Sequence, residues 1–565
     1  MTTDPAPLLA AVEGLRASAD DVRLPLELDG VEQARTSRRE LVQQLDDYVL
    51  PRLRSLDAPL LAVVGGSTGA GKSTIVNSVV GEHVTRTGVI RPTTRASVLV
   101  HHEEDTRWFT DKRVLPELAR VVGDDAEDDP SAVRLVTSDT LPSGLALLDA
   151  PDIDSVVQAN RFLSKQLLSA ADLWLFVTTA ARYADAVPWD LLREASERGT
   201  SVAVVLNRVP PEALTQVRLH LASMLREQGL GKAPIFVIDE AELEDGMIPA
   251  RSIERLSGWL QSLAGDARAR SVVIRRTLTG TLGSLSQRAH ALAEEGRGQV
   301  AAAGALATAP DTAYRDALAG VTEGIDDGSL LRGEVLARWQ ELVGTGEFFR
   351  SIEAGIGRFR DRVGAWFTGK EVSSEPLGEA LQSGAAALIT SHGQVAASTA
   401  ARAWKNAPGG APLMAEHPEL SKASTGFGEK VERLIRDWQK DIFEMVRDEA
   451  GSRRSTARYL AFGVNGLGVL LMIVVFHATA FIPTGAEVAV GAGTAALAQR
   501  LLEAVFGDQA VRSMAVKARA ALITRVEELY DQERARYDEA LAERPVDATA
   551  ITALEAAARR VEETR

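Results

Sequence analysis

The sequence predicts an α/β domain with a mostly parallel sheet and flanking helices, joined to a long α-helical bundle that carries an apolar hairpin. Three observations support this prediction. Short β-rich runs alternate with helical stretches between residues 57 and 268. From about residue 272 to 458 such runs nearly vanish, and long segments rich in Ala, Leu, Glu and Arg take over. The most apolar stretch of the chain then follows, within residues 459–507.

The composition excludes several kinds of site. The chain of 565 residues contains no cysteine, which excludes a disulfide framework, a zinc-thiolate site and a cysteine nucleophile. Its 63 Lys and Arg against 78 Asp and Glu give a net charge of -15, which argues against nucleic acid as a partner. The N-terminal segment lacks the basic start and apolar stretch of a secretory signal peptide, so we expect an intracellular protein.

The expected elements divide the chain into five segments. They are N-terminal helices, the α/β domain, a helical bundle or stalk, the apolar hairpin and a C-terminal helix that returns to the bundle: residues 1–56, 57–268, 269–458, 459–507 and 508–565. Within the bundle we expect several breaks, one of them around Pro310. The charged C-terminal helix is long enough to pack as a coiled coil along another long helix.

A phosphate-binding loop (P-loop) is predicted near the start of the α/β domain. The run from Gly66 to Ser73 satisfies G-x-x-x-x-G-K-[ST], an apolar strand precedes it and a helical stretch follows. We expect Lys72 to neutralise β- and γ-phosphate oxygens and the Ser73 hydroxyl to bind Mg²⁺. The predicted phosphate-binding residues are Gly66, Ser67, Thr68, Gly69, Ala70, Gly71, Lys72, Ser73, Thr74 and, through its backbone N–H, Asp152.

Two further residues are predicted to act on the metal ion with Ser73. The apolar strand that ends in Asp149 places a carboxylate beside the P-loop, where it can hold Mg²⁺ through water. In the segment GVIRPTTRASVLV we expect Thr94 to close over the ion and the γ-phosphate, with Thr93 as the alternative. The other interpretations are a carboxylate that caps the next helix and ordinary polar loop residues.

The P-loop, the PTT loop, the strand ending in DAPD and the helical remainder with its apolar hairpin together resemble a bacterial dynamin-like protein. The resemblance implies a P-loop GTPase-like domain that uses GTP and Mg²⁺. It also implies membrane lipid as a partner, with remodelling or scaffolding as the outcome and division sites as one place of action. Self-assembly or a paired dynamin-like chain is implied as well. In this family N-terminal helices pack with C-terminal ones near the nucleotide-binding domain.

Three positions depart from the pattern of such GTPases. Asp152 stands where D-x-P-G has its glycine and brings negative charge near the phosphates. Thr68 occupies the position of the glutamine that helps to orient the attacking water, so we expect slow hydrolysis. With Lys72 and Thr94, Thr68 completes the predicted catalytic residues. The guanine-reading motif [NT]-K-x-D is replaced by a run that ends in Pro210, which cannot accept hydrogen bonds from the base.

The predicted base-binding residues are Asn207, Arg208 and Asp239, the last as a substitute acceptor. Because the base motif is incomplete, a preference for GTP over ATP follows from the resemblance alone. Two other functions stay open. The P-loop also suits an ATPase or a transporter component, although the chain lacks an L-S-G-G-Q-like signature. The departures also suit a nucleotide-bound membrane scaffold that does not hydrolyse.

The hairpin is predicted to contact the membrane. The run Leu460–Ile482 carries no formal charge and is long enough for a transmembrane helix. Arginines stand before it, and more cations stand at or after the end of the second arm, from Arg500 on. The positive-inside rule therefore predicts a protein at the cell membrane with both termini and the nucleotide-binding domain in the cytoplasm. The other interpretation is a hairpin buried in the bundle, because its Gly and Ala content suits close packing.

Overall fold

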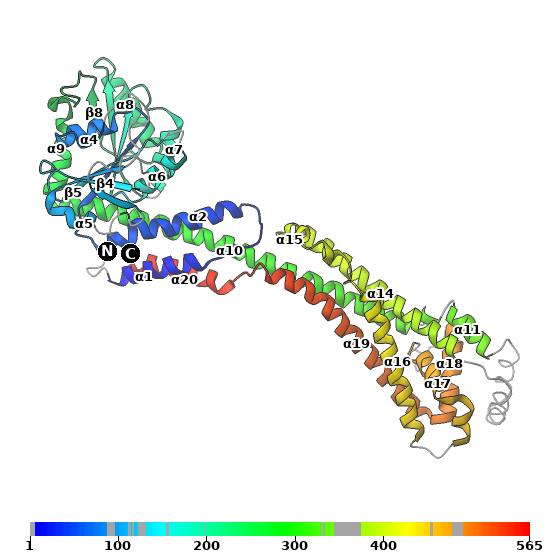
Figure 1. Cartoon of the computed structure of the whole chain (residues 1–565). Coiled ribbons are helices and arrows are strands. Elements are labelled where there is room, and N and C mark those ends of the chain that lie inside the picture. The colour runs from blue at the N-terminus through cyan, green and yellow to red at the C-terminus, as the bar shows by residue number, and fades with distance from the viewer. Residues whose placement is uncertain are drawn as a thin grey trace. The chain divides into compact units, whose positions relative to one another are not determined.

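The computed structural model describes residues 6–86, 97–110, 115, 118–122, 132–153, 158–197, 199–327, 329–331, 334–343, 374–451, 456–476 and 490–565. The chain divides into two compact units, which are treated separately below (Figure 1). The first unit comprises Met1–Leu24, Gly30–Gly298 and Asp547–Arg565. The second unit comprises Pro25–Asp29 and Gln299–Val546.

An eight-stranded sheet forms the centre of the first unit, in the order β3-β4-β2-β5-β1-β6-β7-β8. The strands are β1 Leu60–Gly66, β2 Ser97–His101, β3 Ala119–Val122, β4 Ala132–Thr137, β5 Leu145–Asp149, β6 Leu173–Thr179, β7 Ser201–Val209 and β8 Ile235–Asp239. Neighbouring strands are parallel except β2 and β5, which pair antiparallel. The prediction of a mostly parallel sheet is therefore confirmed.

Helices cover both faces of the sheet, because alternate residues of each central strand point to opposite sides. On one side Leu61 and Val63 of β1 belong to a core with residues of α6, α7 and α8. On the other side Leu60 and Val64 belong to a core with residues of α4 and α9. The helices are α4 Lys72–Val80, α6 Gln158–Ser169, α7 Ala186–Glu197, α8 Leu214–Glu227 and α9 Ala250–Gly265. Strands buried on both faces explain the continuous apolar runs in the sequence.

Helices from both ends of the chain complete the first unit. They are α1 Ala6–Asp21, α2 Val31–Gln44, a π-helical turn Leu45–Val49, α3 Leu50–Arg54 and α20 Ala548–Thr564. Helices α1 and α20 pack side by side (Figure 1). The predicted C-terminal segment 508–565 is thus divided, since α19 (Asp508–Ala542) belongs to the second unit.

The first part of α10 (Ala267–Asp326) is attached to the amino ends of β6 and β7. Thr277 Oγ1 donates to the carbonyl of Asp172 at 2.9 Å and accepts from the backbone N–H of Ser201 at 3.1 Å. Nearby, a Cβ built on Gly199 would lie 2.4 Å from the carbonyl carbon of Gly280. The helix backbone can approach the sheet this closely only because both positions are glycine.

The second unit is helical, as predicted. Besides the remainder of α10 it contains α11 Glu334–Val343, α14 Glu375–Asn406, α15 Gly410–Glu416, α16 Phe427–Gly451, α17 Thr456–Val475, α18 Val490–Phe506 and α19. One apolar core runs through these helices and includes the buried rings of Trp404, Trp438 and Tyr537. The break predicted around Pro310 is wrong, because α10 continues through this residue. Leu306 and Tyr314, on either side of the proline, are buried, so packing holds the helix together there.

The described part of the predicted membrane hairpin lies inside the second unit. Helix α17 packs against α16, α18 and α19, and every residue from Leu467 to Phe476 is buried. Among the described residues, no helix combines the length and the apolar character that a membrane crossing needs. For these residues the buried-hairpin interpretation therefore describes the structure. A helix that is apolar on every side can be enclosed by other helices as well as by lipid. Residues 477–489, which include the predicted turn, lie outside the described residues.

Candidate functional site

The predicted P-loop has the expected strand–loop–helix geometry. It leaves β1 at Gly66, and α4 begins at Lys72. A Cβ built on Gly66 would lie 2.0 Å from the carbonyl oxygen of Val177 in β6, so no side chain fits there. Gly71, the residue before α4, has φ 90°, which favours glycine. The loop is therefore tightly curled at the carboxyl end of β1, with a helix N-terminus beside it, as phosphate binding requires.

Lys72 lies at the centre of the loop, with a side chain that is 6% exposed. Its ammonium group donates to the carbonyl oxygens of Gly66 at 3.1 Å and Ser67 at 3.2 Å. It also forms an ion pair with Asp152 Oδ1. An ammonium group has three N–H donors, so these three partners use all of them.

Ser73 and Asp149 lie next to each other, as a magnesium site would require. Ser73 Oγ donates to Asp149 Oδ2 at 2.6 Å. The other oxygen, Asp149 Oδ1, is buried and has no hydrogen-bond partner among the described residues. Burial raises the pKa of Asp149 to about 6, although the Ser73 hydrogen bond and the Lys72 charge lower it. A hydroxyl and an orphaned carboxylate oxygen are ligands that Mg²⁺ prefers, so these residues fit the ion.

Three side chains from neighbouring strands and loops brace the P-loop. Asn207 Nδ2 donates to the carbonyl of Ala70 at 2.9 Å, and Arg182 Nη1 donates to the carbonyl of Thr68 at 2.8 Å. Arg208 Nη2 lies 4.0 Å from the position of a Cβ built on Gly71. These contacts come from the carboxyl ends of β6 and β7, the edge where parallel sheets bind ligands.

The remaining predicted residues are placed less fully. Asp239 ends β8 and pairs through its backbone with Val209, so it lies one strand away from Arg208. Thr74 follows Ser73 in the first turn of α4, and Gly69 has φ 72°. Thr93 and Thr94 lie outside the described residues.

Two polar residues that the sequence interpretation missed connect α4 to the segment that follows it. Asn77 Oδ1 accepts from the backbone N–H groups of Val84 and Thr85 at 3.0 and 2.9 Å. Thr85 Oγ1 in turn donates to the carbonyl of Ser73 at 3.2 Å. Asn77 could have been found as the polar residue within the apolar run IVNSVV. Arg182, which follows β6, has no comparable signal.

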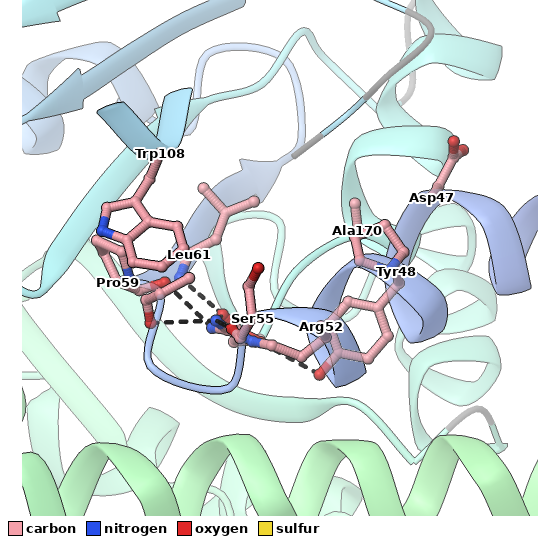
Figure 2. Close-up of a pocket in the computed structure, with 11 residues that line it drawn as sticks. Asp47, Tyr48, Arg52, Ser55, Pro59, Leu61, Trp108 and Ala170 are labelled. Carbon is pink, nitrogen blue, oxygen red and sulfur yellow. Dashed lines mark hydrogen bonds and ion pairs between the residues drawn. The ribbon is translucent and has the colours of Figure 1, made fainter. Parts of the chain in front are cut away.

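A second polar cluster lies at the opposite, amino end of β1 and lines a pocket (Figure 2). Arg52 forms an ion pair with Asp172, and the Tyr48 hydroxyl donates to Asp172 Oδ1 at 3.2 Å. Arg52 also donates to the carbonyls of Ala58 and Pro59, both at 3.1 Å. Because these groups hold one another, we assign the cluster to the fold and not to a ligand. Among the described residues, no group of three or more His, Cys, Asp or Glu side chains could hold a metal ion.

Comparison with known proteins identifies a family segment. Residues 61–209 match the sequence profile of the Dynamin family. No curated protein sequence matches the chain. The matched segment contains the P-loop, Asp149, Asp152, Arg182 and Asn207.

Three solved structures are also similar to this chain. A chain of an oligomerised bacterial dynamin pair, described as a mechanism for long-range sensing and tethering of membranes, is 11% identical, with a TM-score of 0.48 over 100% of this chain and 96% of that chain. A variant of Era from Aquifex aeolicus, bound to GDP and aluminium fluoride, is 18% identical, with a TM-score of 0.24 over 36% of this chain and 56% of its own. Toc33 from Arabidopsis thaliana, with Mg²⁺ and GMPPNP, is 16% identical, with a TM-score of 0.25 over 41% and 94%.

Proposed function

We propose that this chain, whose residues 61–209 form a dynamin-family GTPase domain, binds GTP with Mg²⁺ at its P-loop and couples slow hydrolysis to an action on membranes. The observation that carries the nucleotide part is the convergence of Lys72, Ser73 and Asp149 at the tightly curled loop after β1. A buried cation, a hydroxyl and an orphaned carboxylate oxygen are the groups that a nucleotide phosphate with its magnesium ion needs.

Each residue of the site has a proposed role. Lys72 binds the β- and γ-phosphate oxygens, Ser73 binds the magnesium ion and Asp149 holds it through water. The ion, when bound, supplies positive charge that stabilises the transferring phosphoryl group. Thr94 closes over the ion and the γ-phosphate. Thr68 orients the attacking water, less well than a glutamine because its side chain is shorter, so hydrolysis is slow.

The base is the least determined part of the proposed substrate. Asn207 spends its amide on the P-loop carbonyl of Ala70, and Pro210 offers no acceptor to a guanine ring. We assign the acceptor role to Asp239, at the end of the strand beside Arg208. Preference for GTP over ATP rests on the family match.

Equilibrium binding of GTP and of ATP to the purified full-length chain, with Mg²⁺, tests the nucleotide proposal. We expect GTP to bind more tightly, and Lys72→Ala to weaken binding by about 100-fold or more because a buried charge-assisted contact to phosphate is lost. Tighter binding of ATP would contradict the GTP assignment. GTP binding without any turnover would instead favour the non-hydrolysing scaffold, for which the Lys72–Asp152 ion pair is the supporting observation.

The membrane part of the proposal places lipid contact in the hairpin, residues 459–507. Its apolar residues from Leu467 to Phe476 are enclosed by the second unit, so they must leave this core to reach lipid. We propose that nucleotide binding and self-assembly, or pairing with a second dynamin-like chain, promote this release at the cell membrane, with the GTPase domain and both termini on the cytoplasmic side. The outcome is membrane remodelling or scaffolding.

A disulfide lock tests whether the hairpin must be released. A Cβ built on Gly378 of α14 would lie 3.4 Å from Val469 Cγ2 of α17, and the chain has no other cysteine to interfere. We expect the oxidised Gly378→Cys/Val469→Cys chain to lose liposome flotation and to regain it on reduction. The single Val469→Cys chain should float under both conditions. Flotation of the fully oxidised double variant would overturn the release step.

A further inference from the structure

The ion pair between Lys72 and Asp152 has a role of its own in the nucleotide site. Lys72 is the buried partner, whereas the Asp152 side chain is 31% exposed and belongs to the segment that follows β5. Of the three groups that accept from the Lys72 ammonium, the two carbonyls are neutral parts of the P-loop. Only Asp152 among these three brings a negative charge, so it stands in the relation to Lys72 that a phosphate oxygen would have.

A triphosphate needs the same lysine. Lys72 has no donor left beyond its three present partners, and the carbonyls of Gly66 and Ser67 come from its own loop. A γ-phosphate oxygen can therefore bind Lys72 most simply by displacing the Asp152 carboxylate. The displaced carboxylate would remain beside the γ-phosphate, because Asp152 follows the magnesium-binding strand by three residues. Two like charges at this spacing repel each other by an amount that changes affinity more than tenfold.

We infer that Asp152 is an internal competitor of the γ-phosphate for Lys72, which lowers the affinity of this domain for nucleoside triphosphates relative to diphosphates. The inference rests on nucleotide binding at the P-loop as proposed above. A diphosphate lacks the group that meets Asp152 most closely, so its binding is affected less. An event that draws Asp152 away from Lys72, such as docking of a second chain, would raise triphosphate affinity.

The backbone at this position does not require the glycine that Asp152 replaces. Among the described residues other than glycine, those with positive φ are Leu115, Arg208 and Asp245. Asp152 is described and is not one of them, so its main chain is unstrained with an aspartate side chain. Substitution at this position therefore changes the charge near Lys72 without relieving backbone strain.

Binding of GDP and of the non-hydrolysable triphosphate GMPPNP, measured by calorimetry with Mg²⁺, tests this inference. We expect Asp152→Asn to raise GMPPNP affinity by roughly tenfold or more and GDP affinity by less than about threefold. Asp152→Gly should give the same ratio, since it removes the same carboxylate. Asp139→Asn, which removes an exposed carboxylate in the same unit, should leave both affinities unchanged.

Each other outcome overturns a defined part. An equal gain for both nucleotides would show that Asp152 does not discriminate the γ-phosphate, and the inference would fail while the proposed function stands. Unchanged affinities with a slower turnover of GTP would also overturn it and would make Asp152 a residue that orients water. If wild type and both Asp152 variants bound neither nucleotide, the proposed function and the inference would fail together. Thermal unfolding of each variant checks that the fold is retained.

Discussion

Replacing Asp172 by alanine is expected to destabilise the first unit by about 3–5 kcal/mol, because it leaves the buried guanidinium of Arg52 without its counter-charge. The carboxylate also accepts the backbone N–H of Leu61 at 2.8 Å and the Tyr48 hydroxyl. Its loss therefore leaves two further buried donors unpaired. Since Leu61 lies in β1, which leads directly into the P-loop, the phosphate site is expected to loosen as well.

Amide hydrogen exchange of the full-length chain in rising urea measures this effect within the unit concerned. Peptides from β1 and β6 should lose protection in the Asp172→Ala variant. The matched control is Asp190→Ala, because Asp190 pairs with Arg193 at 3.2 Å but has a side chain that is 69% exposed. Such a pair contributes roughly 0–1 kcal/mol. Equal protection in the two variants would show that the cluster of Figure 2 does not hold the first unit together.

Replacing Leu471 by aspartate is expected to disrupt the second unit in the absence of any lipid. Leu471 is 0% exposed within the core around α17. A carboxylate there must either lose its hydration without a partner or force the helices apart, which costs several kcal/mol. We expect peptides from α16 and α19 to exchange rapidly, because both helices pack on α17.

The control for this variant is Val516→Asp, since Val516 is 66% exposed on α19 of the same unit. It introduces the same charge and should leave exchange unchanged. The two interpretations of the hairpin differ in the result. If α17 were free of the bundle in solution, Leu471→Asp would preserve exchange protection and would affect only flotation with liposomes.

Much of the fold follows from the sequence because strands buried on both faces leave a clear apolar signal. Every strand of the sheet except β3 coincides with an apolar run. The exception is short, contains Arg120 and lies at the edge of the sheet, where a strand needs less apolar character. The P-loop was equally accessible, since its glycines and Lys72 have fixed spacing.

Other features could not be predicted because they depend on what each side chain meets in space. The sequence places a charge at Asp152, but the choice of Lys72 as its partner depends on how the segment after β5 folds back. The apolar run around Leu471 satisfies a bilayer and a helical core equally well. Pro310 predicts a break that packing around Leu306 and Tyr314 overrides.

The pairing of α1 with α20 has a consequence for the order in which the first unit is completed during synthesis. Leu8, Val12 and Leu15 of α1 are buried in the finished unit, and α1 packs against α20. A ribosome reaches Ala548 long after Asp21, roughly half a minute to two minutes later at about 5–20 residues per second. The nascent chain must therefore carry the apolar face of its first helix without its final partner while everything between is made. A chaperone that binds the emerging chain has this face as its earliest target.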